Sequence, residues 1–365
     1  MLSWIRNFSD KEIHAPFSVK TDNDYIIDLR KRFSHFCDLL HRASADEESI
    51  EIAEYYTNMV CKALDSYYKG KITSYHSIIK SLVQCCEDDE LALSYLNHSR
   101  AFQGDHGSEI QFFRARLNHE ITIFPPQEMV HIPFDKRSKS GNYRFSIPGV
   151  ISLYLANSSY GCWIELGRPP EQEFNVSPIV LDDEQKIFNL AVMSRDCSQL
   201  DDGDEKRVHC WIKLLILMIA TSYRVDEKDR TFKSEYIISQ SIMLACKELN
   251  YDGVAYYSKR VDNELFSLAA INLALFAEYQ PDQKYGSICQ HLKVDESLNF
   301  QFFKQLSQSV TFKEYPLRVV RTPLITNIGS FHRQYSYRET AFYFFDRYLF
   351  SRWDDKDTIE WGNFF

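Results

Sequence analysis

The chain lacks the short motifs that identify many nucleotide-binding and hydrolytic enzymes. It has no G-x-x-x-x-G-K-[ST] phosphate loop, no G-x-G-x-x-G fingerprint, no H-E-x-x-H zinc motif and no G-x-S-x-G nucleophile elbow. Its 9 cysteines are odd in number and form no C-x-x-C pair. This pattern argues against a zinc finger and favours free thiols in a reducing compartment, so no metal site is expected.

Positive charge and long apolar runs are also scarce. The 42 Lys and Arg residues are outnumbered by 51 Asp and Glu residues, and no basic block offers a face for a phosphate backbone. The longest apolar run, residues 211–223, contains Lys213 and is shorter than the roughly 20 residues that span a membrane. No export signal is expected at Met1–Arg6, which lacks a basic segment followed by an apolar core. The sequence predicts a cytoplasmic protein that binds neither nucleic acid nor membranes, and self-association stays open.

Apolar and aromatic side chains, in contrast, are abundant. Hydrophobic residues make up 44% and aromatic residues 15% of the chain, which is ample for a folded core. Three stripes at helical spacing follow one another between Asp24 and Cys86. Their residues are Ile26, Leu29, Phe33, Phe36, Cys37 and Leu40; Ile52, Tyr55, Tyr56, Met59, Val60, Ala63, Leu64 and Tyr67; and Tyr75, Ile78, Ile79, Leu82, Val83 and Cys86. The stripes predict a small helical bundle.

The pattern changes at the turn-rich segment 103–108, which predicts a boundary between a helical domain over 1–108 and a second domain over 109–365 with a C-terminal helical segment. Strands are expected at 110–117, 149–156, 187–192, 253–258 and 268–276, and helices at 159–166, 208–222 and 234–249. Strands and helices do not alternate regularly. The predicted class is therefore α+β.

Three polar residues stand out between Met129 and Pro169. Arg144 follows a polar loop, Tyr154 ends an apolar strand after a Pro148-Gly149 turn, and Glu165 lies in a mostly apolar helix. A glutamate in such surroundings more often faces solvent than a site. The residues alone therefore favour a structural interpretation over a catalytic one.

The order and spacing of these residues resemble the RES domain, a family named for its Arg, Glu and Ser. Arg144 precedes Tyr154 by 10 residues, and Tyr154 precedes Glu165 by 11, the spacing associated with that family's active-site trio. One position departs from the short members of the family, because Ser146 stands where they usually carry Asn. Serine can keep the local turn hydrogen bond, but a direct Asn contact to ligand would be weakened. Further segments resemble the family at 113–116, 131–134 with Arg137, 236–240 and 251–258.

The resemblance implies a mixed β core like that of ADP-ribosyltransferases, with NAD⁺ as substrate. Members form the toxin half of bacterial toxin–antitoxin pairs. Glu165 would stabilise the oxocarbenium-like ribose or hold its hydroxyls, and Tyr154 would stack on nicotinamide. Arg144 would hold a ribose hydroxyl or the pyrophosphate. Ser258 would contact ligand or, in our preferred interpretation, support the Arg144 loop.

Arg114 and Arg116 share one side of their strand, where one of them could line the pocket and either could equally form a surface salt bridge. His131 is expected to be structural.

The resemblance leaves several functions open. The first is an NAD⁺ glycohydrolase or phosphorolase that acts as a toxin or phage-defence effector. The alternatives are mono-ADP-ribosylation of a protein and a non-catalytic interaction module that retains the fold. A helix-turn-helix-type antitoxin or another regulator is the expected partner, and residues 1–108 are hypothesised to restrain the site.

Overall fold

The structure is a computed structural model that describes residues 4–5, 8, 13, 15–20, 22–86, 93–95, 110–182, 185–192, 205–227, 229–260, 270–309, 327–330 and 333–354. The chain forms two compact units, each assembled from segments distant in sequence. Unit 1 comprises Met1–Ser94, Asn142–Ile147 and Lys186–Lys259; unit 2 comprises Tyr95–Gly141, Pro148–Gln185 and Arg260–Phe365. The units thus do not coincide with the predicted domains 1–108 and 109–365. The predicted boundary segment lies outside the described residues, and that division stays a prediction.

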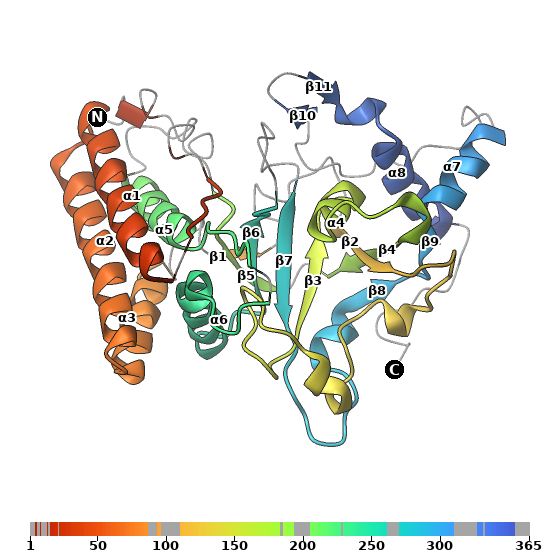
Figure 1. Ribbon diagram of the computed structural model, residues 1–365, viewed down its shortest axis with the longest axis horizontal. Coiled ribbons are helices and arrows are strands. Elements are labelled where there is room, and N and C mark those ends of the chain that lie inside the picture. The colour runs from red at the N-terminus through yellow and green to blue at the C-terminus, as the bar shows by residue number, and fades with distance from the viewer. Residues whose placement is uncertain are drawn as a thin grey trace. The chain divides into compact units, whose positions relative to one another are not determined.

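Unit 1 is mainly helical (Figure 1). Each predicted stripe lies on a helix, and most stripe residues are buried. An exception is Tyr55, which is 58% exposed because it lies at the solvent side of its helix. The helices are α1 (Asp22–Arg42), α2 (Glu47–Tyr68), α3 (Ile72–Gln84), α5 (Glu205–Ala220) and α6 (Ile237–Glu248), with a 3₁₀ turn at Ser234–Tyr236.

The N-terminal helices pack on helices from the middle of the chain. Helix α2 contacts α5 and α3 contacts α6. The Tyr75 hydroxyl donates to the Ile237 carbonyl, and His76 contacts both Ser241 and Glu248 across the α3–α6 interface. Removing residues 1–108 would expose the apolar faces of α5 and α6. The N-terminal helices are therefore an integral part of unit 1.

Unit 1 also contains a parallel pair of strands, β5 (Lys186–Asn189) and β6 (Gly253–Tyr257). Strand β6 lies within the predicted strand 253–258, and β5 overlaps the predicted strand 187–192 but begins one residue earlier. The short strand β1 (Leu93–Tyr95) lies at the division between the units.

Unit 2 is built on an antiparallel sheet of order β7-β3-β2-β4-β8, with β9 also paired to β4. The strands are β2 (Ile110–Leu117), β3 (Ser152–Ala156), β4 (Phe174–Leu181), β7 (Ile271–Phe276), β8 (Leu292–Val294) and β9 (Leu298–Asn299). Strand β4, buried along its whole length, was not predicted. It contains Pro178, and proline argues against a central strand because it cannot donate to the ladder. Residues 268 and 269 of the strand predicted at 268–276 lie outside the described residues.

Helices cover one face of this sheet. Helix α4 (Ser159–Glu165), α7 (Phe300–Ser309) and α8 (Ala341–Asp354) all contribute to a cluster that includes Phe113 of β2 and Val176 of β4. Burying each large side chain of such a cluster contributes roughly 1.5–3 kcal/mol. The remaining elements are the hairpin β10 (Asn327–Ser330) and β11 (Arg333–Ser336) and 3₁₀ turns at Pro126–Glu128, Phe134–Lys139, Glu171–Glu173, Ser287–His291 and Tyr337–Glu339.

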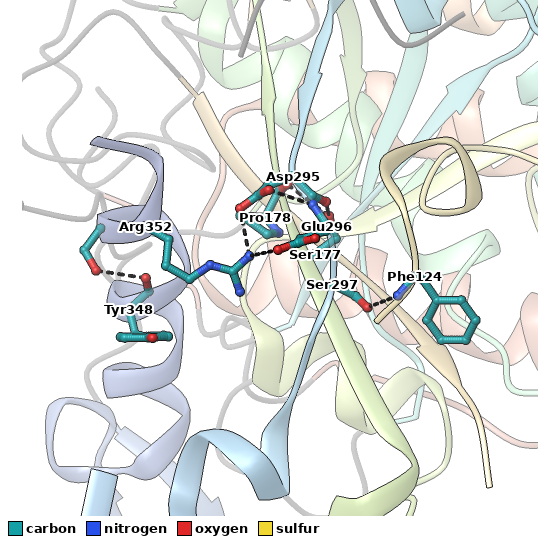
Figure 2. Close-up of polar contacts among 9 residues, drawn as sticks. Phe124, Ser177, Pro178, Asp295, Glu296, Ser297, Tyr348 and Arg352 are labelled. Carbon is teal, nitrogen blue, oxygen red and sulfur yellow. Dashed lines mark hydrogen bonds and ion pairs between the residues drawn. The ribbon is translucent and has the colours of Figure 1, made fainter. Parts of the chain in front are cut away.

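A polar network fastens α8 to the sheet (Figure 2). Arg352 Nη2 donates to the buried Asp295 carboxylate at 3.0 Å and lies 3.5 Å from Glu296 Oε1. The Ser177 hydroxyl of β4 donates to the Asp295 carbonyl, and the Phe124 amide donates to Ser297 Oγ at 2.8 Å. The turn between β8 and β9 is thereby held from both sides.

The predicted α+β class is confirmed, since helices accompany both parallel and antiparallel strand pairs. In the part of the chain that the structure describes, no helix combines the length and apolarity needed to cross a bilayer.

Candidate functional site

The predicted site residues fall into both units. Arg144 and Ser258 belong to unit 1, whereas Arg114, Tyr154 and Glu165 belong to unit 2. Each group is described within its own unit below.

Helix α4 positions Glu165, its last residue. The Ser158 hydroxyl caps the helix by accepting from the Gly161 amide at 2.9 Å. A Cβ on Gly161 would lie only 3.2 Å from Ala156 Cβ, so glycine lets the helix approach strand β3 closely. Gly167, with φ of +84°, ends the helix in the left-handed conformation that favours glycine. Ser158, Gly161 and Gly167 thus determine the start of α4, its close packing on β3 and its end.

A buried carboxyl group from α8 provides a second anchor for α4. The Ser159 amide donates to Asp346 Oδ1 at 3.1 Å, and the Tyr337 hydroxyl donates to Asp346 Oδ2 at 2.6 Å. Burial raises the pKa of Asp346 to about 7, although these hydrogen bonds oppose the shift. Asp346 was not among the predicted functional residues, because the pattern of α8 gives no sign of a partner so distant in sequence.

Glu165 is held by a residue of strand β7. Asn272 Nδ2 donates to Glu165 Oε1 at 2.6 Å, and Arg260 Nε lies 3.7 Å from Glu165 Oε2. The Glu165 side chain is 33% exposed and that of Arg260 42%, so solvent weakens this ion pair. A carboxylate at a helix C-terminus lies at the negative end of the helix dipole, so this position does not serve helix stability.

Tyr154 lies in the middle of β3, opposite Ala274 of β7. Side chains two residues apart on a strand share a face, as do directly paired residues on neighbouring strands. Tyr154 therefore shares a face with Ala156 and, through the pairing of Ala156, with Asn272. Tyr154 and Asn272, the partner of Glu165, therefore both lie on the face of the sheet that α4 covers.

The two arginines of β2 lie on the other face. Phe113 and Ala115 belong to the cluster beneath α4 and α8, so the alternating Arg114 and Arg116 point away from it. Arg114 Nη1 donates to the Tyr154 carbonyl at 3.0 Å. Arg116 Nη1 lies 3.0 Å from Glu128 Oε2 in an exposed ion pair, which matches the salt-bridge interpretation for this residue.

Arg144 of unit 1 occupies a tight turn. Tyr143 and Ser146 pair with each other through their backbones, which leaves Arg144 and Phe145 at the two corner positions. The turn is thus formed by backbone groups, with Ser146 at its last position. The Gln240 amide nitrogen fixes the turn by donating to the carbonyls of Tyr143 at 3.1 Å and Ser146 at 3.3 Å.

The Arg144 guanidinium is oriented by one hydrogen bond and one ring. Nη2 donates to the Tyr223 carbonyl at 3.0 Å, and the guanidinium carbon lies 5.7 Å from the Tyr256 ring centroid. Nη1 is buried and has no hydrogen-bond partner in the described part of the chain. Tyr223 is itself held by the N-terminal region, because its hydroxyl donates to Asp28 Oδ2 at 2.8 Å and its backbone pairs with Phe17. A buried, unsatisfied guanidinium nitrogen is suited to an oxygen ligand.

Ser258 is fully buried directly after β6. The next residue, Lys259, is also buried, and its ammonium donates to Ser222 Oγ at 2.7 Å. Lysine is rarely buried in a protein, so Lys259 is a functional candidate that sequence reasoning missed. The one sequence feature that could have identified Lys259 is its position directly after segment 251–258, which resembles the family.

His131 has the surroundings of a structural residue, as expected. Its Nε2 accepts from the Gly286 amide at 3.0 Å, which leaves Nδ1 to donate to the Ile132 carbonyl at 2.7 Å. Burial lowers the pKa of His131 to about 4, so the ring stays neutral near pH 7.

A cavity of about 210 Å³ lies elsewhere in unit 1, and none of the predicted site residues lines it. Its walls come from Ile13, Asp28, Lys31, Arg32, His35, Phe36 and Ile219. Arg32 already pairs with Asp28 at 2.6 Å.

Comparison with known proteins gives three similarities. The family model described as "RES domain" matches residues 119–297. YopC of Bacillus subtilis (strain 168), a candidate toxin by its name, is 30% identical over 275 residues, which cover 70% of this chain and 57% of YopC. A crystal structure of the M. tuberculosis MbcT–MbcA toxin–antitoxin complex overlaps 60% of this chain and 91% of its own at 15% identity, but its TM-score of 0.30 is too low to support a structural comparison. This chain thus spans little more than half the length of YopC. The match to the RES domain over residues 119–297 includes Arg144, Tyr154, Glu165 and Ser258.

Proposed function

We propose that this protein cleaves the bond between nicotinamide and ribose in NAD⁺. The observation that carries the proposal is Glu165, a half-buried carboxylate at the end of α4 that Asn272 orients through a 2.6 Å hydrogen bond. It lies within the segment that matches the RES domain, at a spacing from Tyr154 that resembles the family pattern. An oriented carboxylate is the group that cleavage of a glycosidic bond requires, because positive charge develops on the ribose.

The other predicted residues receive complementary roles. Tyr154 lies on the same face of the sheet as Asn272, where its ring would stack on nicotinamide. Arg144 would bind the pyrophosphate through its buried Nη1, and Lys259 adds a second cation near Ser222, the neighbour of Tyr223. We assign Ser258 to supporting this part of unit 1, since it is fully buried.

The cellular role that fits this chemistry is a toxin or defence effector that depletes NAD⁺. The name of YopC and the match to the RES domain support this role. The resemblance to toxins of toxin–antitoxin pairs suggests an antitoxin as the neutralising partner. Transfer of the ribose to a protein side chain uses the same cleavage step, so the acceptor of the ribose separates this alternative from hydrolysis and phosphorolysis. A module that keeps the fold without turnover would release no nicotinamide.

The test measures nicotinamide release from NAD⁺ by the purified chain, with and without inorganic phosphate, and identifies the ribose product by mass spectrometry. Glu165→Gln and Glu165→Ala are expected to reduce turnover roughly a hundredfold or more, the scale of losing one electrostatic contact to a transition state. Glu171→Gln is the matched control, because this exposed glutamate pairs only with Lys304 among the described contacts of its carboxylate. Wild-type turnover by Glu165→Ala would refute the assignment of the site.

A further inference from the structure

Asn272 carries a buried polar atom that the described residues leave without a hydrogen bond. The residue is only 3% exposed, and its Nδ2 is engaged by Glu165. Its Oδ1 is buried and has no hydrogen-bond partner among the residues that the structure describes. Buried side-chain oxygens are normally hydrogen-bonded, because leaving one without a donor destabilises the fold.

The orientation of this amide follows from its neighbour. An ionised Glu165 carboxylate can only accept hydrogen bonds, so the atom 2.6 Å from Oε1 must be the amide nitrogen. The reverse orientation would place two acceptor oxygens at that distance. The unsatisfied atom is therefore the acceptor of the Asn272 side chain, and only a hydrogen-bond donor can satisfy it.

This acceptor lies where the proposed function places the substrate ribose. Asn272 shares a face of the sheet with Tyr154 and touches Glu165, so it adjoins both residues assigned to the nicotinamide ribose. The pyrophosphate has no donor at neutral pH. The donors of this half of NAD⁺ are the two vicinal ribose hydroxyls and the carboxamide of nicotinamide.

We propose that Asn272 contacts the substrate, with Oδ1 accepting a hydrogen bond from a hydroxyl of the nicotinamide ribose while Nδ2 orients Glu165. The inference rests on the proposed function. Asn272 and Glu165 together present two acceptors to a vicinal diol. Sequence reasoning does not identify Asn272, because it lies in an apolar strand 107 residues after Glu165.

The experiment compares wild type and Asn272→Ala on four substrates. These are NAD⁺, two analogues that lack the hydroxyl at the second or the third carbon of the nicotinamide ribose, and one with a carboxylate in place of the carboxamide. On NAD⁺ the variant should lose more than roughly tenfold in kcat/KM, because the lost ribose contact has the scale of one hydrogen bond and the misorientation of Glu165 adds to that loss. One deoxy analogue lacks the hydroxyl that Asn272 binds, so the variant has no contact to lose on that substrate. The ratio of wild-type to variant kcat/KM should therefore be smaller than on NAD⁺ and should reflect only the misorientation of Glu165.

Controls separate this contact from a structural effect. Asn299→Ala removes another buried asparagine of the same sheet, one that donates to the Gln172 carbonyl at 2.8 Å. Any loss of kcat/KM in Asn299→Ala should be equal on all four substrates. Thermal unfolding of each variant checks folding, and Asn272→Ser replaces Asn272→Ala if the alanine variant does not fold.

Each outcome has a defined meaning. Equal losses on all four substrates would overturn the substrate contact and leave Asn272 as a structural residue. If the ratio of wild-type to variant kcat/KM is smaller only with the carboxylate analogue, Asn272 binds the nicotinamide carboxamide and the proposed ribose contact is wrong. If wild type releases no nicotinamide from NAD⁺, the proposed function itself fails, an outcome distinct from either of these.

Discussion

The Tyr223 carbonyl accepts a hydrogen bond from Arg144 Nη2 at 3.0 Å, and through it the N-terminal region reaches a predicted site residue. The Tyr223 hydroxyl donates to Asp28 of α1, and the Tyr223 ring packs edge-on against Tyr25 at 4.8 Å between centroids. The hypothesis that residues 1–108 restrain the site stays a prediction. These contacts give the N-terminal helices a supporting role for Arg144.

Arg144→Lys is expected to lower kcat/KM for NAD⁺ roughly ten- to a hundredfold, the scale of hydrogen bonds to a charged group. A lysine ammonium cannot donate to Tyr223 and a ligand oxygen with the geometry of a planar guanidinium. Steady-state kinetics of nicotinamide release provide the measurement. Arg116→Ala serves as the control and should stay within about twofold of wild type, because its partner is the exposed Glu128. Unchanged kinetics in Arg144→Lys would contradict the role of Arg144.

Asp346→Asn is expected to change how stability depends on pH. The folded pKa of Asp346, about 7, lies above its ordinary value of 3.8, so between these values the folded state binds more protons than the unfolded state. The contribution of this group to stability is present below about pH 4 and is lost as pH rises to about 7, with a slope of up to about 1.4 kcal/mol per pH unit. Asparagine does not titrate and removes that slope. Urea unfolding at about pH 5 and about pH 8 tests this, and an equal pH dependence in variant and wild type would rule it out.

Arg352→Leu is expected to destabilise unit 2 by roughly 3 kcal/mol, because it removes the ion pair that Arg352 makes with the buried Asp295 carboxylate. The comparison is Arg30→Leu, which breaks an exposed pair with Asp65 and should cost less than about 1 kcal/mol. Adding Asp295→Asn to Arg352→Leu should recover part of the loss. Urea unfolding of the variants gives the free energies, and equal costs for the two arginine variants would contradict this account of the network in Figure 2.

Much of the secondary structure is predictable from local pattern. Strand β2 begins and ends at the predicted residues, and helix α4 differs from its prediction by one residue. The spacing of apolar residues and the capping residues depend only on neighbouring positions, so they can be read without knowledge of the tertiary structure. Strand β4 was missed because the local effect of Pro178 argues against a central strand, and pairing with β2 on one side and β8 on the other outweighs it.

Part of the candidate site is also readable from sequence. The spacing of Arg144, Tyr154 and Glu165 indicates the RES domain, which the family match over 119–297 confirms. The roles of these residues stay predictions. Asn272 and Lys259 escape sequence reasoning, because an asparagine in a strand and a lysine after one are ordinary until their burial is known.

The sequence by itself determined helices α1 to α6, strands β2, β3, β5, β6 and β7, and the resemblance to the RES domain, since periodicity, caps and motif spacing are properties of neighbouring residues. The tertiary structure alone decided that residues 142–147 join unit 1 while Tyr154 and Glu165 join unit 2. It also decided that Asn272 orients Glu165 and that Asp346 anchors α4. The contacts of Asn272 with Glu165 and of Asp346 with Ser159 join residues more than 100 positions apart, and hydrogen bonding in the folded chain brings them together.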